Sequence, residues 1–415
     1  MVPPTRAAAL LALLVAASSA LACGPEAPRP AASERERVLG PFLSAHWRIP
    51  AGPQGPRPSG TSEAVATLQP AICGACHPEQ YADWRGSLHA QAASPGLLGQ
   101  LIEGDLSRPQ SHRVCMSCHA PLDEQQLWDS DLRPNARFDS ELRAHGLLCA
   151  GCHVRSHRFF GPPRRDDAPT PPDPPPHGGF ETRPEYHESR FCAECHQFFD
   201  DPGPTSADGA GGSKPIQNTY FEWLASPQAA EGRQCQDCHM PDRRHLWRGI
   251  HDPEMVRAAV DVDLLADDLG GETLRASLLL TSRDVGHAFP TYVTPRVFVS
   301  IHQEDAERHE IEGTRVAATI GREVDLSTGT EIFDTRIAPG QSVKLDYSEA
   351  RVERAASLVG RVTVDPDFHY RGVFSYLDGS LRDPQARALN REAGLQISDS
   401  AYVLAEIRRP LPAAR

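Results

Sequence analysis

Lysine is nearly absent from this chain. Only Lys214 and Lys344 occur among 42 basic residues, so almost all of the positive charge is arginine. Acidic residues outnumber basic ones by 55 to 42, which gives a net charge of −13. Because nucleic-acid binding relies on a basic surface, this balance argues against a nucleic-acid partner. Long hydrophobic runs are also missing: the apolar stretch 7–17 is shorter than the ~20 residues of a membrane-spanning helix.

The same apolar stretch is typical of an export signal. Arg6 precedes it and small residues follow it, as in a secretory signal peptide. Residues 1–22 are therefore predicted to be a signal peptide. Cys23 follows an Ala-Leu-Ala sequence, a pattern similar to the bacterial lipobox, in which that cysteine is lipidated. Plain secretion is the alternative.

Residues 23–70 are rich in Pro, Ala, Gly and Arg and show no periodic hydrophobic pattern. This composition predicts a flexible linker, here one that connects a lipid anchor to a folded body. His46 and Trp47 interrupt the segment, and we interpret them as a packing site instead of a ligand site.

The remaining ten cysteines all belong to one repeated motif, C-x-x-C-H. Random placement of 11 Cys and 18 His in 415 residues would produce roughly 0.013 copies of this motif, which is the attachment signature of c-type haem. Zinc ribbons and disulfide frameworks do not require a histidine after every second cysteine. The five copies are Cys73–His77, Cys115–His119, Cys149–His153, Cys192–His196 and Cys235–His239.

These motifs predict five covalently bound haem c groups, each with its iron. The two cysteines of a motif lie one helical turn apart and form thioethers, and the adjacent histidine is the proximal iron ligand. The attaching cysteines are Cys73, Cys76, Cys115, Cys118, Cys149, Cys152, Cys192, Cys195, Cys235 and Cys238, and the proximal ligands are His77, His119, His153, His196 and His239. Because few residues separate successive motifs, we expect residues 71–260 to form short helices and loops packed around haems.

Methionine is too scarce to supply the second axial ligands. The chain has 4 methionines, and of these only Met255 lies clear of the signal and the motifs. Paired histidines are therefore expected, with low reduction potentials. The candidates are His89, His112, His145, His187, His245 and His251, with His287 either a haem contact or a turn residue. His157 is a further histidine of the segment, and His177, in a proline-rich loop, is interpreted as solvated.

Cysteine and tryptophan disappear after about residue 260, and the pattern changes to strands. Alternating and β-branched residues with Gly and Pro turns between them predict an antiparallel, β-sandwich-like domain over residues 261–410. The expected strands are 274–281, 296–302, 315–320, 342–347, 358–364 and 402–407.

Three blocks resemble a known family: residues 73–90, residues 219–241 and the Gly-His-Ala-Phe-Pro-Thr sequence at 286–291. They are similar to the bacterial multihaem cytochromes related to the tetrahaem electron carrier of ammonia oxidisers and to hydroxylamine oxidoreductase. The resemblance implies that His89 is a distal ligand, to the haem of another motif. The chain departs from the family pattern at Tyr292, where a glycine is usual.

We expect a carrier that transfers electrons along its haems in the bacterial cell envelope, because the cofactor supplies the chemistry and the protein sets spacing and ligation. One alternative is an oxidoreductase that acts on a small nitrogen or sulfur compound, similar to hydroxylamine or nitrite, at a five-coordinate haem. Another is a subunit of an extracellular haem conduit. Expected partners are other cytochromes or a membrane quinol oxidase or reductase, with oligomers allowed. The expected location is the periplasm or outer membrane, lipid-anchored, and the cell surface is the alternative.

Overall fold

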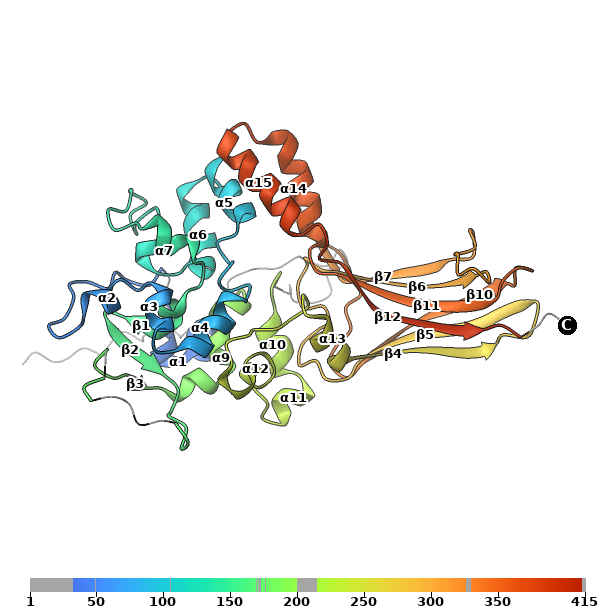
Figure 1. Cartoon of the computed structure of the whole chain (residues 1–415), viewed down its shortest axis with the longest axis horizontal. Helices are drawn as coiled ribbons and strands as arrows, with labels where there is room; N and C mark the ends of the chain where they lie inside the picture. The colour runs from blue at the N-terminus through green and yellow to red at the C-terminus, as the bar shows by residue number, and fades with distance from the viewer. Residues whose placement is uncertain are drawn as a thin grey trace, which may run out of the picture.

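The computed structural model describes residues 33–48, 50–104, 106–168, 170, 173–175, 177–199, 215–325 and 330–412. The expected signal peptide and Cys23 lie outside these residues. Short helices gather at one end of an elongated molecule, and long strands extend from the other end (Figure 1). The helical end contains all five motifs. Among the described residues, none of the helices combines the length and the apolar character needed to cross a membrane.

The helical body consists of short elements, as the close spacing of the motifs predicts. Helix α4 covers Tyr81 and Trp84, and Trp84 is buried while Leu88 beyond its end is 55% exposed. The elements are α1 (Glu34–His46), α2 (Glu63–Ala66), α3 (Pro70–Gly74), α4 (Pro78–Arg85), α5 (Pro95–Glu103), α6 (Pro109–His119), α7 (Ser140–Ala144), α8 (Cys149–His153), β1 (Val154–Arg155), β2 (Arg158–Gly161), β3 (Glu181–Thr182), α9 (Arg190–His196), α10 (Thr219–Leu224), α11 (Pro227–Ala230), α12 (Cys235–His239) and α13 (Pro253–Ala259).

Part of the segment expected to be a flexible linker is folded. Helix α1 begins at a capping box formed by Ser33 and Glu36, which satisfies free N–H groups of the first turn. Leu39 and Leu43 are fully buried and, with Trp47, form a cluster against α9. Composition alone suggested no periodicity because Gly40 and Pro41 interrupt the helix at a kink.

The other end of the molecule contains two antiparallel sheets with strand orders β10-β5-β4 and β12-β11-β6-β7, and a smaller β8-β9 pair. Leu278 of β5, Val299 of β6 and Val362 of β11 belong to one buried core shared by the two larger sheets. All six expected strands are present. The strands are β4 (Val260–Asp268), β5 (Thr273–Ser282), β6 (Arg296–Glu304), β7 (Val316–Ile320), β8 (Arg322–Asp325), β9 (Thr330–Asp334), β10 (Ser342–Ala350), β11 (Ser357–Asp365) and β12 (Tyr402–Pro410).

Two helices that the strand pattern did not predict interrupt the β region. Helices α14 (Phe368–Ser380) and α15 (Pro384–Gln396) form a hairpin that reaches back to α5 of the helical body (Figure 1). The approach is close enough that a side chain at Gly96 of α5 would collide with Phe374 of α14. The hairpin therefore ties the β region to the helical body.

Candidate haem-binding sites

Each Cys-x-x-Cys-His motif lies in or at the end of a short helix. Helices α8 and α12 consist of their motifs alone, and the motif histidines of α6 and α9 are the last residues of those helices. The first motif bridges α3 and α4, with His77 directly before Pro78. Helical spacing places the two sulfurs of a motif one turn apart, which suits two thioethers on one porphyrin edge.

Three motif histidines face a second histidine across a gap of nearly constant width. The ring centres of His89 and His196 are 6.3 Å apart, those of His153 and His245 are 6.2 Å apart, and those of His239 and His287 are 6.3 Å apart. Imidazole nitrogens bind transition metals at about 2 Å, so two imidazoles on opposite sides of one ion have ring centres about 6 Å apart. The residues therefore fit a haem iron with two axial histidines.

Hydrogen bonds at Nδ1 orient these rings. His153 Nδ1 donates to the Phe160 carbonyl at 2.8 Å, and His239 Nδ1 donates to the Arg248 carbonyl at 2.5 Å. On the opposite sides, His245 and His287 each bond a carbonyl at 3.0 Å through Nδ1. A bond at Nδ1 fixes the tautomer and leaves Nε2 for a metal.

Burial keeps the imidazoles neutral, which metal binding requires. It lowers the pKa of His89 to about 3 and the pKa values of His153 and His196 to about 4. His89 Nδ1 is also buried without a hydrogen-bond partner. Because an unpaired buried polar atom is unfavourable, a ligand bound at Nδ1 itself would satisfy this atom.

The first two motifs differ from the other three. Burial, and then the neighbouring charge of His177, lowers the pKa of His77. His177 is oriented by a 2.8 Å bond from Nδ1 to the Gly179 carbonyl and by stacking on Phe159. His119 donates from Nδ1 to the Ala92 carbonyl at 2.6 Å. Within the described parts of the chain, no second histidine ring stands 6.2–6.3 Å from His119.

The other histidine candidates bond or contact groups other than the motif histidines. His112 Nε2 bonds the Leu101 carbonyl at 2.9 Å, His187 Nε2 lies 2.9 Å from Arg243, and His251 Nε2 lies 3.1 Å from Asp367. These contacts occupy the nitrogen that would bind iron. His145 lies beside Trp84, and His157 Nε2 bonds the Gly55 carbonyl at 3.2 Å. His46 and Trp47 are buried packing residues, as predicted.

Cysteines of different motifs contact one another. Interaction with Cys73 raises the pKa of Cys149, and interaction with Cys118 and burial raise that of Cys195. Cys192 is affected in the same way by Cys235. These contacts place the first motif beside the third, and the fourth motif beside both the second and the fifth. Cys152 of the third motif is also a charge neighbour of Cys192 and Cys195. The fourth motif therefore lies beside the second, third and fifth motifs.

A loop of the β region contributes to the fifth site. His287 lies in it, and the loop is held by Glu222 of α10, which accepts bonds from Ala288 N at 3.2 Å and Thr291 Oγ1 at 3.1 Å. Arg336, with a side chain 4% exposed, pairs with Glu222 at 2.9 Å and donates to the Thr291 carbonyl at 2.8 Å. Sequence reasoning missed this pair, because the two residues are far apart in the chain.

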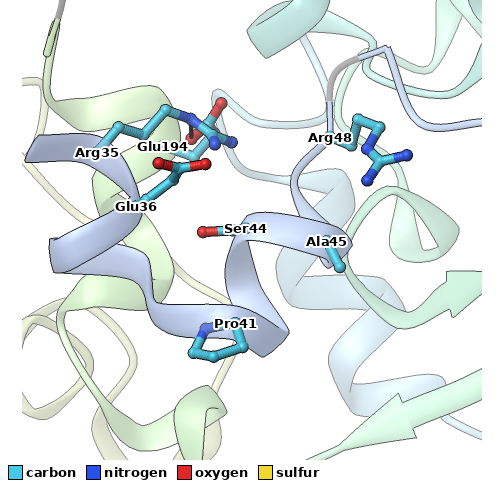
Figure 2. Close-up of a pocket in the computed structure, with 7 residues that line it drawn as sticks. All are labelled: Arg35, Glu36, Pro41, Ser44, Ala45, Arg48 and Glu194. Carbon is cyan, nitrogen blue, oxygen red and sulfur yellow. Dashed lines mark hydrogen bonds and ion pairs between the residues drawn. The ribbon is translucent and has the colours of Figure 1, made fainter. Parts of the chain in front are cut away.

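A cavity of about 460 Å³ lies between α1 and α9. Figure 2 shows Arg35, Glu36 and Ser44 of α1 around it, with Glu194 of the fourth motif close to Arg35. The Arg35–Glu194 ion pair at 2.7 Å ties α1 to the fourth motif. Of the residues that the structure describes, no histidine or cysteine lines the cavity, so these residues add no ligand to the sites above.

Comparison with known proteins supports the haem interpretation. Residues 72–154 match the family model described as cytochrome c554 and c-prime. The chain is also similar to the crystal structure of a penta-heme cytochrome c552 from Thermochromatium tepidum, with 18% identity, a TM-score of 0.58, and coverage of 83% of this chain and 98% of that one. No curated protein matches.

The motifs, the family model and the shared fold together support a multihaem c-type cytochrome, a haem protein that transfers electrons. The described residues contain no group of three or more His, Cys, Asp or Glu side chains arranged to hold a metal ion by themselves. The narrower relation to the carrier of ammonia oxidisers and to hydroxylamine oxidoreductase stays a prediction.

Proposed function

We propose that this chain binds five haem c groups and carries electrons along them in the bacterial cell envelope. The observation that carries the proposal is the set of three opposed histidine pairs at 6.2–6.3 Å. A second histidine on each iron fills the position that a substrate would need, which favours electron transfer over catalysis at these sites. His177 is proposed as the second ligand opposite His77, from its neighbouring position.

The cysteine contacts support an order for the electron route. The first and third motifs adjoin through Cys73 and Cys149, and the third adjoins the fourth through Cys152. The fourth continues to the fifth through Cys192 and Cys235. Because the cysteines attach to porphyrin edges, neighbouring cysteines imply neighbouring edges. The proposed route runs first, third, fourth, fifth, with the second motif as a branch at the fourth.

Mass and spin state test this proposal together. The intact mass of the mature protein should exceed that of the apoprotein by five haem units, and four or fewer would contradict the count. Low-temperature EPR of the oxidised protein should show mostly low-spin iron. His245→Ala should convert one low-spin centre to high spin, whereas His251→Ala, which alters the neighbouring candidate, should leave the spectrum unchanged. The reverse result would overturn the proposed pairing.

The proposed location follows from the N-terminal sequence. Cys23 is proposed as the lipidated first residue of the mature protein. The proposed location is the periplasm or the outer membrane, and the proposed partners are other cytochromes or a membrane quinol oxidase or reductase. Cys23→Ser should release the protein from the membrane fraction, and Ser19→Ala should not. Retention of the Cys23→Ser protein on membranes would show that the anchor is elsewhere.

The second motif supports a second candidate function, reduction or oxidation of a small nitrogen or sulfur compound. The observation is that a main-chain carbonyl orients His119, as it does His153 and His239, but among the described residues no histidine ring faces His119 at 6.2–6.3 Å. Rapid binding of cyanide or nitrite, with a high-spin EPR signal in the parent protein, would favour this function. If the parent protein shows neither rapid binding nor a high-spin signal, the second candidate function is excluded and electron transfer remains the proposal. The β region is proposed to be a sandwich that supplies His287 to the fifth site.

A further inference from the structure

A five-residue segment just after the fifth motif, residues 244–248, contains two groups that bear on different haem sites. His245 is the proposed second ligand of the third site, because its ring faces that of His153. The Arg248 carbonyl accepts the 2.5 Å bond from His239 Nδ1 at the fifth site. The segment therefore takes part in the third and fifth sites at once.

Trp247 of the same segment lies between two imidazoles. Its ring centre is 4.5 Å from that of His89 and 5.1 Å from that of His245, and the planes cross at 85° and 87°. Aromatic rings prefer such edge-to-face contacts, so the indole favours one orientation of each imidazole. Because His89 faces His196, Trp247 extends the reach of the segment to the fourth site.

The backbone of the segment depends on support from elsewhere in the chain. Trp247 has a φ of +42°, in the left-handed region that residues with a Cβ rarely adopt. Such a conformation persists only where surrounding contacts hold it. The contacts that place Trp247 between the two imidazoles must therefore fix the segment as a whole.

Asp83 of α4 supplies this support. Its carboxylate accepts from Arg244 Nε at 2.7 Å, from Arg244 Nη2 at 2.6 Å and from the main-chain N–H of His245 at 3.0 Å. The Asp83 side chain is 6% exposed and that of Arg244 is 50% exposed. Bidentate bonds between arginine and a carboxylate are strong and fix geometry. The start of the segment is therefore held on α4.

From these contacts we infer that residues 244–248 position the axial ligands of the third, fourth and fifth haems together, and that Asp83 holds this segment in place. Groups that contact a metal ligand orient it, so Asp83 and Trp247 are positioning residues. The inference rests on the proposed function, in which the facing histidines are iron ligands. The three haems are successive on the proposed route, so one displacement of the segment would alter ligation at three successive positions.

Three histidine variants assign the EPR signals that the test needs. The low-spin signals of the third, fourth and fifth haems are those lost in His245→Ala, His89→Ala and His287→Ala. A parent protein in which these variants remove no low-spin signal would overturn the proposed function. That result is read before Asp83 is changed, so it is distinguishable from failure of the present inference.

Asp83→Asn in the full-length holoprotein tests the inference. An amide has one acceptor oxygen where the carboxylate has two, so the bidentate bond to Arg244 is lost. The signals of the third, fourth and fifth haems should all shift or convert in part to high spin. Trp247→Leu should shift the third and fourth signals. If Asp83→Asn does not retain five haems by mass, Arg244→Gln breaks the same pair from its exposed side and should give the same three changes.

Asp123→Asn is the matched control, because Asp123 is also a buried carboxylate of the helical body that accepts from Nε and Nη2 of one arginine, Arg137. The side chains of Asp123 and Arg137 are 10% and 49% exposed, close to the values for Asp83 and Arg244. This variant should keep all three signals at their parental positions.

Three outcomes would overturn the inference. One is a change confined to the third haem in the variant that breaks the Asp83–Arg244 pair, since the segment would then serve His245 alone. Another is a parental fourth signal in Trp247→Leu. The last is an equal change in Asp123→Asn, which would reflect general loosening of the helical body.

Discussion

Replacement of Arg336 by methionine should release the loop that presents His287. Arg336 bonds Glu222 of α10, the Thr291 carbonyl of the loop and Asp334, the last residue of β9. The side chains of Arg336, Glu222 and Asp334 are 4%, 12% and 14% exposed. Burial opposes the charge of Arg336, but the bonds to Asp334 and Glu222 outweigh it and raise the arginine pKa. The ion pair therefore holds the loop on the helical body.

The size of this effect follows from the carboxylate charge of Glu222, which Arg336→Met leaves buried without its arginine partner. Removal of one partner of a buried ion pair costs about 3–5 kcal/mol, and each ~1.4 kcal/mol changes an equilibrium tenfold. In Arg336→Met the equilibrium constant for release of the loop from α10 should rise by roughly 10² to a few times 10³. EPR should then show a high-spin fraction at the fifth site, and cyanide should bind faster than to the parent.

A second substitution separates this effect from general destabilisation. Adding Glu222→Gln to Arg336→Met removes an orphaned charge and should restore part of the low-spin signal, a coupling that a double-mutant cycle measures. Arg361→Met, which breaks the Arg361–Glu406 pair of β11 and β12, should not change the spin state. If Arg336→Met lowers stability but leaves the spin state and cyanide binding at parental values, the loop is held by other contacts and the reasoning is refuted.

Three further predictions follow from the histidines. His177→Ala should convert one low-spin iron to high spin in EPR, and His157→Ala should not; equal spectra would remove His177 as a ligand. The imidazole planes of His89 and His196 are inclined by 73°, and those of His239 and His287 by 11°. The His89–His196 pair should therefore give the more anisotropic low-spin EPR signal. Loss of that signal in His287→Ala would contradict its assignment to this pair. Burial lowers the pKa of His46 to about 3, so between about pH 6.5 and 3 the unfolded chain binds a proton that the folded chain excludes. The free energy of unfolding should therefore fall as pH decreases through this window, by at most about 5 kcal/mol. In denaturant titrations, His46→Gln should lack this part of the pH dependence of stability.

Local chemistry made part of this molecule predictable. The motif cysteines and histidines could be identified from the sequence, because the signature for covalent haem attachment consists of adjacent residues only. The strands follow from alternation, since β6 and β11 present alternate residues to one shared core. Helix α14 escaped prediction because Phe368–Ser380 contains two glycines and several aromatic residues, which are weak helix formers.

The second ligands depend on tertiary structure, and sequence distinguishes them poorly. His245 and His251 follow the fifth motif closely, yet His245 faces His153 and His251 faces Asp367, next to α14. A proline-rich sequence indicated that His177 is solvated, but stacking on Phe159 holds it near His77. Hydrogen-bond partners and stacking partners are set by chain segments that no local pattern identifies.

The β region is best understood as part of the haem environment. One short loop supplies His287 opposite His239 and Tyr292 to His196, and Arg336 holds that loop on α10. The loop therefore contacts the fourth and fifth motifs at once, through His287 opposite His239 and through the bond of Tyr292 to His196. Because both contacts require the loop to be docked, release of the loop should alter spin state at the fifth site and potential at the fourth together. A change at one site without the other would show that the two contacts are independent.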